Sequence, residues 1–193
     1  MRRLAPLTLS LVVTLGCSGG RTKPPVEPAP PTGDTAAPPA AAPSGDRPHF
    51  TSFQIEDNRL VLPGPIVFAT GTAELDEAAS ADALWYLHDY LVAKDYITLV
   101  RIEGHGDVAG EDALMDTGER ALAVGRWLER HDIDCKRLMA AAFGDTKPVA
   151  DGSTPEGRAQ NRRIEVVNAE LRGRAIGGMP VDGGAPAAVP VCD

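Results

Sequence analysis

The uneven distribution of proline most strongly limits where this chain can fold. Residues 18–48 hold 9 of the 17 prolines, together with many alanines and almost no large apolar side chain. Such a segment cannot bury enough apolar surface to offset the entropy lost on ordering it. The sequence therefore predicts an extended tether that can reach up to roughly 95 Å when fully extended.

The C-terminal segment has a similar composition. Glycine, proline and alanine dominate from about Gly173 onward, which predicts a disordered tail over residues 173–193. One folded domain is then expected over residues 49–172.

The charge of the chain is concentrated in this domain. Residues 1–48 contain 5 basic and 3 acidic residues and the rest contains 14 basic and 24 acidic ones, so the net charge of −8 divides into +2 and −10. An acidic domain repels a phosphate backbone, which argues against nucleic acid as a partner.

The N-terminus has the pattern of an export signal. Arg2 and Arg3 precede a mostly apolar run, Leu4–Leu15, that is too short to span a bilayer. The pattern predicts a signal peptide over residues 1–16 and a mature protein in the periplasm.

Cys17 follows Thr14, Leu15 and Gly16, and this stretch resembles a bacterial lipobox, although Thr14 and Leu15 stand in the opposite order. By this resemblance, Cys17 becomes the lipid-carrying N-terminus, and several acyl chains anchor the protein durably. Ser18 stands where an Asp would resemble an inner-membrane retention signal, which implies the outer membrane. The alternative is a secretory signal cut nearby, with Cys17 an incidental residue.

Two further cysteines, Cys135 and Cys192, leave two interpretations open. They form a disulfide in an oxidising compartment, or they remain as unremarkable thiols. Neither has the spacing of a metal ligand, and no metal or cofactor is expected.

Between the two tails, short β-type runs alternate with helical patterns. In the first helix Leu84, Leu87 and Leu91 recur at intervals of three and four residues, with Asp76 as its N-cap. In the second helix Ala121, Val124 and Leu128 recur in the same way, with Asp116 and Glu119 as the capping pair at its start. The β-type runs cover residues 59–62, 66–68, 97–102, 138–143 and 164–167.

This order of elements predicts an α/β (α+β) fold. Two layers are expected, in the order β-α-β-α-β-β, with two main helices packed on a mixed sheet.

The segment Ile102–Gly110 carries the most informative chemistry. An apolar strand ends there in glycines that bracket His105 and Asp107. Ligands usually bind at the carboxyl ends of parallel strands, so Asp107 is well placed to meet one. Arg120 follows on the second helix. We assign His105 a structural role, because no second His or Cys lies at ligand spacing.

These pieces together resemble the OmpA-like, peptidoglycan-associated domain family. The resemblance runs from Ile66 to Glu165 and rests on the order and spacing of several motifs: Ile66-Val67-Phe68 with Gly71, Ile102 to Gly110, Arg120-Ala121, Gly144 with Pro148-Val149, and Thr154 to Arg158 leading to Asn161-Arg162-Arg163. It implies a non-enzymatic domain that binds peptidoglycan.

The resemblance also implies the site residues. In the family, an Asp and an Arg bind the diaminopimelate of the peptidoglycan stem peptide, and the matching positions here are Asp107 and Arg120. A zwitterionic end group needs one anion and one cation, and the planar fork of an arginine can grip a carboxylate with two hydrogen bonds. The remaining candidates for ligand contact are Phe68, Thr70, Gly71, Asn161 and Arg162.

The chain departs from the family pattern beside this pocket. The stretch between Gly110 and Arg120 is slightly shorter, Ala113 replaces the usual Asn, and Asp116-Thr117 replaces the usual Leu-Ser. These changes are expected to shift the arginine relative to the aspartate and to lower affinity.

Two functions follow from the sequence. The first is an outer-membrane lipoprotein that tethers that membrane to the wall, and the second is a protein-interaction module in an envelope complex. Asp107 and Arg120 can also be interpreted as a salt bridge that ties a loop to a helix. Catalysis is not expected, because Ser153 and Thr154 have no paired base.

Overall fold

The computed structural model describes residues 47–176 and 187–192. The predicted signal peptide, Cys17 and nearly all of the predicted tether lie outside this range, as do residues 177–186 and 193 of the predicted tail. Contacts within the chain place the described residues in one compact unit.

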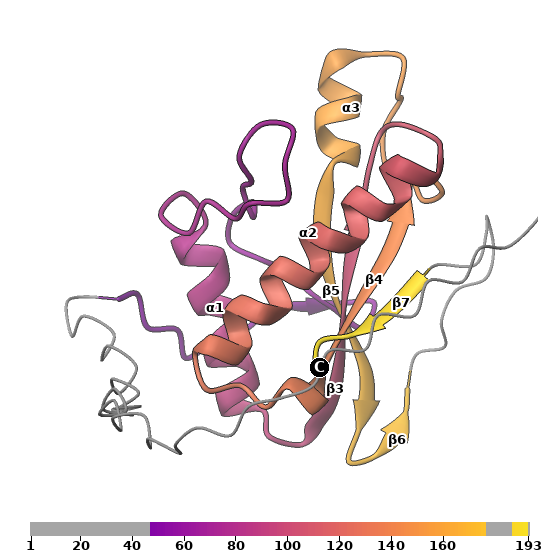
Figure 1. Ribbon diagram of the computed structural model, residues 1–193. Coiled ribbons are helices and arrows are strands. Elements are labelled where there is room, and N and C mark those ends of the chain that lie inside the picture. The colour runs from indigo at the N-terminus through magenta and orange to yellow at the C-terminus, as the bar shows by residue number, and fades with distance from the viewer. Residues whose placement is uncertain (1–46, 177–186, 193) are drawn as a thin grey trace, which may run out of the picture. The chain divides into compact units, whose positions relative to one another are not determined.

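Three long strands form the centre of a mixed sheet (Figure 1). They are β3 (Ile97–His105), β4 (Leu138–Gly144) and β5 (Arg163–Leu171). β3 lies between the other two, parallel to β4 and antiparallel to β5. The carboxyl ends of β3 and β4 therefore meet the beginning of β5 at one end of the sheet, the upper end in Figure 1.

Shorter strands extend this sheet at both edges. β1 (Ile55–Glu56) and β2 (Arg59–Leu60) continue it beyond β5, and β6 (Arg174–Ala175) pairs with the end of β5. β7 (Ala187–Pro190) adds an antiparallel strand to the edge of β4. The order across the sheet is β1-β2-β5-β3-β4-β7.

β6 and β7 correct the prediction of a disordered tail from residue 173. The prediction was wrong for residues 174–175 and 187–190 because backbone pairing with β5 and β4 provides order that a composition rich in small residues does not reveal. Cys192 also forms a disulfide with Cys135, with the two Cα atoms 5.2 Å apart. This bond decides between the two interpretations of the cysteines and fastens the end of β7 to the short 3₁₀ turn η1 (Cys135–Arg137).

Two helices cover one face of the sheet, α1 (Ala81–Ala93) and α2 (Glu111–Arg130), and the short helix α3 (Pro155–Asn161) lies at its upper end (Figure 1). The predicted fold class, with two main helices on a mixed sheet, is confirmed.

The periodic leucines lie where the sequence predicts them, in the core between helices and sheet. Leu84, Leu87 and Leu91 are fully buried, together with Val124 and Leu128 of α2 and with strand residues that include Val100, Ile102 and Val166. Burying each such side chain stabilises the fold by roughly 1.5–3 kcal/mol.

Both predicted helix starts were wrong. α1 begins after Ser80, because Asp76 closes a separate turn by accepting a hydrogen bond from the N–H of Ala79. α2 begins at Glu111, so Asp116 lies inside the helix; Gly110, with a φ of 120°, turns the chain into it. Acidic residues in that first turn favour the earlier start through the helix dipole.

The predicted strand at residues 66–68 is also reduced. It forms only an isolated bridge between Phe68 and Leu75. Residues 68–75 instead form a tight loop in which the N–H of Ala69 bonds the carbonyl of Glu74, and Gly71 takes a positive φ of 75° that favours glycine.

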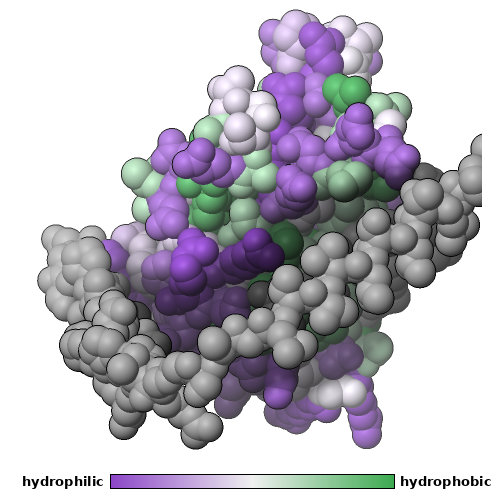
Figure 2. Space-filling model, in the orientation of Figure 1, coloured by the Kyte–Doolittle hydropathy of each residue, from purple (hydrophilic) through white to green (hydrophobic). Residues whose placement is uncertain are grey.

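The surface of the face in Figure 2 is mainly hydrophilic where it is coloured, and hydrophobic residues show chiefly in its upper half. Among the helices that the structure describes, none combines the length and the apolar character needed to cross a bilayer.

Candidate ligand-binding site

The end of β3 is held unusually close to α2, and glycines make this possible. A Cβ atom on Gly104 would lie 1.9 Å from the backbone oxygen of Thr117, and one on Gly106 would lie 3.1 Å from its Cγ2. The hydroxyl of Thr117 also accepts a hydrogen bond from the N–H of Gly144, at 3.1 Å. Thr117 therefore brings Asp107, which follows Gly106, and Arg120, one turn further along α2, to the same end of the sheet.

Asp107 forms an ion pair with Arg162. Its Oδ2 accepts a hydrogen bond from Nη1 of Arg162 at 2.6 Å. The carboxylate is mostly buried, with 11% of its side chain exposed, whereas 46% of the Arg162 side chain is exposed. The anion is thus fixed at the strand end and its partner is the more accessible group.

Arg120 has three different neighbours. Its Nη2 lies 2.8 Å from Oδ2 of Asp116, its Nε donates to the carbonyl of Thr72 at 3.3 Å, and its guanidinium lies 5.7 Å from the ring centre of Phe68. These contacts fix Arg120 against the loop 68–75, which is the loop that also carries Thr70 and Gly71.

Asn161 has a different position from the other predicted contacts. It is 2% exposed, and its Oδ1 accepts hydrogen bonds from the N–H groups of Val149 and Ala150 while its Nδ2 donates to the carbonyl of Ala150. Asn161 therefore fixes the loop between β4 and α3, and we do not place it among the ligand contacts.

The two residues that the sequence pairs, Asp107 and Arg120, have different ion-pair partners. Asp107 and Arg120 do not form an ion pair with each other, because Arg162 and Asp116 are their respective partners. The interpretation of Asp107 and Arg120 as a mutual salt bridge was therefore wrong. Asp116 and Thr72 are site residues that the sequence reasoning missed. The spacing of four residues between Asp116 and Arg120, typical of helical ion pairs, could have revealed the first.

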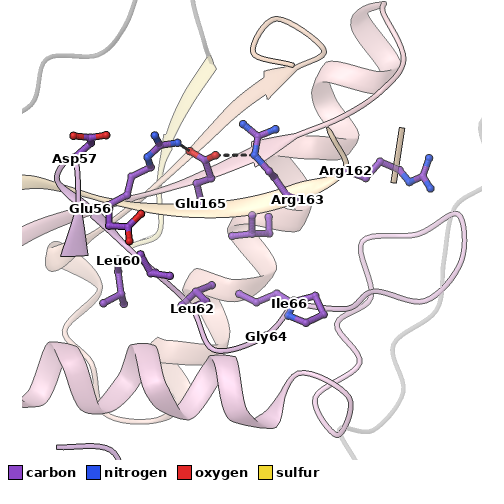
Figure 3. A pocket seen from close by; sticks show the side chains of 13 residues that line it. Glu56, Asp57, Leu60, Leu62, Gly64, Ile66, Arg162, Arg163 and Glu165 are labelled. Carbon is purple, nitrogen blue, oxygen red and sulfur yellow. Dashed lines mark hydrogen bonds and ion pairs between the residues drawn. The ribbon is translucent and has the colours of Figure 1, made fainter. Parts of the chain in front are cut away.

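A hollow of about 320 Å³ borders this site (Figure 3). Its lining includes Leu62, Gly64 and Ile66 on one side and the start of β5 on the other. In Figure 3, the side chain of Arg163 points toward Glu165, whereas that of Arg162 points away from both. Arg59 also donates a hydrogen bond to Glu165, at 2.7 Å. Arg162 therefore pairs with Asp107 and does not contact Glu165, to which Arg59 and Arg163 bond.

The other face of the sheet carries a buried cluster of charges. The ligand atoms of Glu103, His105 and Glu165 lie within 4.8 Å of one another, an arrangement that could in principle hold a metal ion. Arginines already neutralise both carboxylates, since Arg101 pairs with Glu103, and Arg59 and Arg163 pair with Glu165. A dication would be repelled by these three guanidinium groups.

Hydrogen bonding and stacking give this cluster a structural role. Burial alone would raise the pKa of Glu165, but hydrogen bonds from Arg163 and Arg59 hold it below its usual value. The ring of His105 stacks on Phe143, with 5.1 Å between the ring centres. The cluster therefore links β2, β3 and β5 on the face of the sheet opposite the helices.

The fold and the paired charges at one end of its sheet define a small α+β domain suited to binding a charged ligand. Residues 67–162 match the sequence model of the OmpA family, and the chain belongs to that family. Membership of this family confirms the prediction that the domain is not an enzyme.

Two curated relatives and one solved structure illustrate the similarity. The chain is 33% identical over 115 residues to the probable lipoprotein YiaD of Escherichia coli, covering 58% of this chain and 51% of YiaD. It is 32% identical over 132 residues to the peptidoglycan-binding protein ArfA of Mycobacterium tuberculosis, covering 67% of this chain and 38% of ArfA. The chain thus spans about half or less of the relatives' length.

The solved structure is that of a MotB-like protein from Desulfovibrio vulgaris. It aligns with a TM-score of 0.51 and 27% identity, over 60% of this chain and 75% of that one. The arrangement of helices on the mixed sheet is therefore shared with this protein.

Proposed function

We propose that this protein binds peptidoglycan without covalent chemistry and tethers the outer membrane to the cell wall. The ligand is the diaminopimelate of the stem peptide, whose side chain ends in an ammonium and a carboxyl group. Relatives support the proposal: ArfA is named a peptidoglycan-binding protein, YiaD a probable lipoprotein, and a further relative from Pseudomonas aeruginosa is an outer membrane porin.

One observation carries the proposal. At one end of the sheet, Asp107 and Arg120 each rest against a more exposed side chain of opposite charge. A ligand's end groups can displace or join these exposed partners, and neither the anion nor the cation is then left unpaired. The ammonium would take the place of Arg162 on Asp107, and the carboxyl end would meet Arg120 beside Phe68 and the backbone around Thr70 and Gly71.

The tethering part of the proposal depends on the N-terminal segment. Processing at Cys17 would give a lipid anchor, and residues 18–48 would span the distance between the membrane and the wall. Nη1 of Arg47 donates a hydrogen bond to Oδ1 of Asp89 on α1, so the tether would reach the domain beside this helix. Envelope proteins are a second class of partner for the same tethered domain.

A pull-down on purified sacculi tests the binding. We expect the wild-type protein to sediment with sacculi, and Asp107→Ala and Arg120→Ala each to lower the bound fraction at least about tenfold, since each leaves one charge of the ligand unpaired. Asp95→Ala and Arg126→Ala are matched controls, because they remove an exposed charge of the same sign at other places on the domain.

The outcomes separate the two candidate functions. Loss of binding in both site variants with retention in both controls supports recognition of diaminopimelate. A folded wild-type protein that does not sediment with sacculi would contradict the proposal and favour a protein-interaction module.

A further inference from the structure

Arg120 does not present an isolated cation to the site. Asp116 lies one helical turn earlier in α2, and its Oδ2 is 2.8 Å from Nη2 of Arg120. The Arg120 side chain is 18% exposed and that of Asp116 is 39% exposed. A ligand that reaches Arg120 therefore meets an acid and a base side by side.

This pair changes which end group fits best. A carboxylate suits a lone guanidinium, because both of its oxygens accept hydrogen bonds. Here, however, a ligand carboxylate would compete with Asp116 for Arg120 and would be repelled by the negative charge of Asp116. A primary carboxamide is uncharged and has one acceptor oxygen and one NH₂ donor group. Its oxygen can accept from Arg120 while its NH₂ donates to Asp116, so both members of the pair are satisfied.

The ammonium group of the ligand has a separate partner. Asp107 is fixed at the end of β3, and its present counter-ion, Arg162, is exposed and points away from the neighbouring Arg59–Glu165–Arg163 network (Figure 3). An ammonium can replace Arg162 there without leaving a buried charge unpaired. The four side chains Asp107, Asp116, Arg120 and Arg162 carry no net charge together, so their summed charge does not favour a ligand carboxylate over a carboxamide.

We propose that Asp116 sets the ligand preference of this site, and that the site binds a diaminopimelate end whose carboxyl group is amidated more tightly than one whose carboxyl group is free. The inference rests on the proposed function, since it concerns the same pocket and the same amino acid. It adds a residue that selects between two chemical forms of that amino acid.

Isothermal titration with two synthetic stem peptides tests the inference. The peptides are identical except that the side-chain carboxyl group of diaminopimelate is free in one and a carboxamide in the other. We expect the wild-type protein to bind the carboxamide peptide roughly two- to fivefold more tightly, the effect of one screened charge contact. Asp116→Asn, which keeps the size of the side chain, should remove or reverse this ratio by strengthening the binding of the carboxylate peptide.

A control variant separates this local effect from the total charge. Glu119→Gln removes one negative charge from an exposed position on the same helix, and it should leave the ratio of the two affinities unchanged. If Asp116 only stabilises α2, Asp116→Asn will change the melting temperature and not the ratio, which would overturn the inference.

The remaining outcomes distinguish this inference from the proposed function. Equal binding of both peptides by the wild-type protein, or tighter binding of the carboxylate peptide, would overturn the role of Asp116 and leave peptidoglycan binding intact. If the protein sediments with sacculi but binds neither peptide, the role of Asp116 would also be overturned, and the protein would recognise another part of peptidoglycan. No binding to sacculi or to either peptide would overturn both proposals.

Discussion

Asp89 illustrates how one buried carboxylate fixes the point where the chain enters the domain. It lies on α1 and accepts hydrogen bonds from Nη1 of Arg47 and from the N–H of Phe50, both at 2.9 Å, and Nδ1 of His88 is 3.0 Å away. Burial alone would raise the pKa of Asp89, but the hydrogen bonds hold it below its ordinary value of 3.8. The folded state then binds fewer protons than the unfolded state near this pH. The carboxylate therefore stabilises the fold above the ordinary value, and this contribution is lost as the pH falls through the lowered pKa.

Asp89→Asn is expected to lower the free energy of unfolding by about 1–2 kcal/mol near neutral pH, because hydrogen bonds to a charged acceptor are replaced by weaker ones. The difference from wild type should shrink as the pH falls below the ordinary pKa of an aspartate. Urea denaturation at a series of pH values measures both effects. Asp145→Asn, an exposed change in the loop after β4, should show neither, and a difference that persists in acid would contradict the assignment.

At the scale of elements, the contact between β3 and α2 decides the geometry of the site. Gly104→Ala would place a methyl group against the backbone oxygen of Thr117, so the helix has to move away from the strand. We expect a loss of about 1–3 kcal/mol in the free energy of unfolding. Sedimentation with sacculi should also weaken, because Asp107 directly follows β3 and Arg120 lies on α2, and these two elements would move apart. Chemical denaturation and the sacculus pull-down measure these effects.

Gly64→Ala is the control for this change. No atom lies within 4 Å of a Cβ at Gly64, so that variant should keep the stability of the wild-type protein. Equal stability of the two alanine variants would show that the close approach of β3 to α2 does not require a glycine at position 104.

Local patterns predicted the elements better than their partners. The spacing of Leu84, Leu87 and Leu91 predicted the buried face of α1, because helical periodicity is a property of neighbouring residues. An Asp followed three residues later by a Glu occurs by chance inside helices as well as at their starts, so Asp116 misplaced the beginning of α2. The pairing of Asp107 with Arg162 depends on tertiary structure, which no local pattern encodes.

At the scale of the whole molecule, the C-terminal segment returns to the sheet and closes it. β7 pairs with β4, Val191 is buried, and a Cβ on Gly125 of α2 would lie 2.6 Å from Cγ2 of Val191. The bond between Cys135 and Cys192 joins parts of the chain 57 residues apart. Backbone pairing with β4, the buried side chain of Val191 and the disulfide therefore act together to hold β7 in place.

Replacing both Cys135 and Cys192 with Ser should therefore lower the free energy of unfolding by about 2–4 kcal/mol, the range expected when a loop of this length is released in the unfolded state. Urea denaturation with and without a reducing agent measures the loss. Reductant should destabilise the wild-type protein to the level of the double variant and leave the double variant itself unchanged. In the double variant, hydrogen exchange should become faster at the β4 amides that pair with β7. No amide should exchange more slowly than in the wild-type protein. A wild-type protein whose stability and exchange are indifferent to reductant would show that β7 holds its place through backbone pairing and Val191 alone.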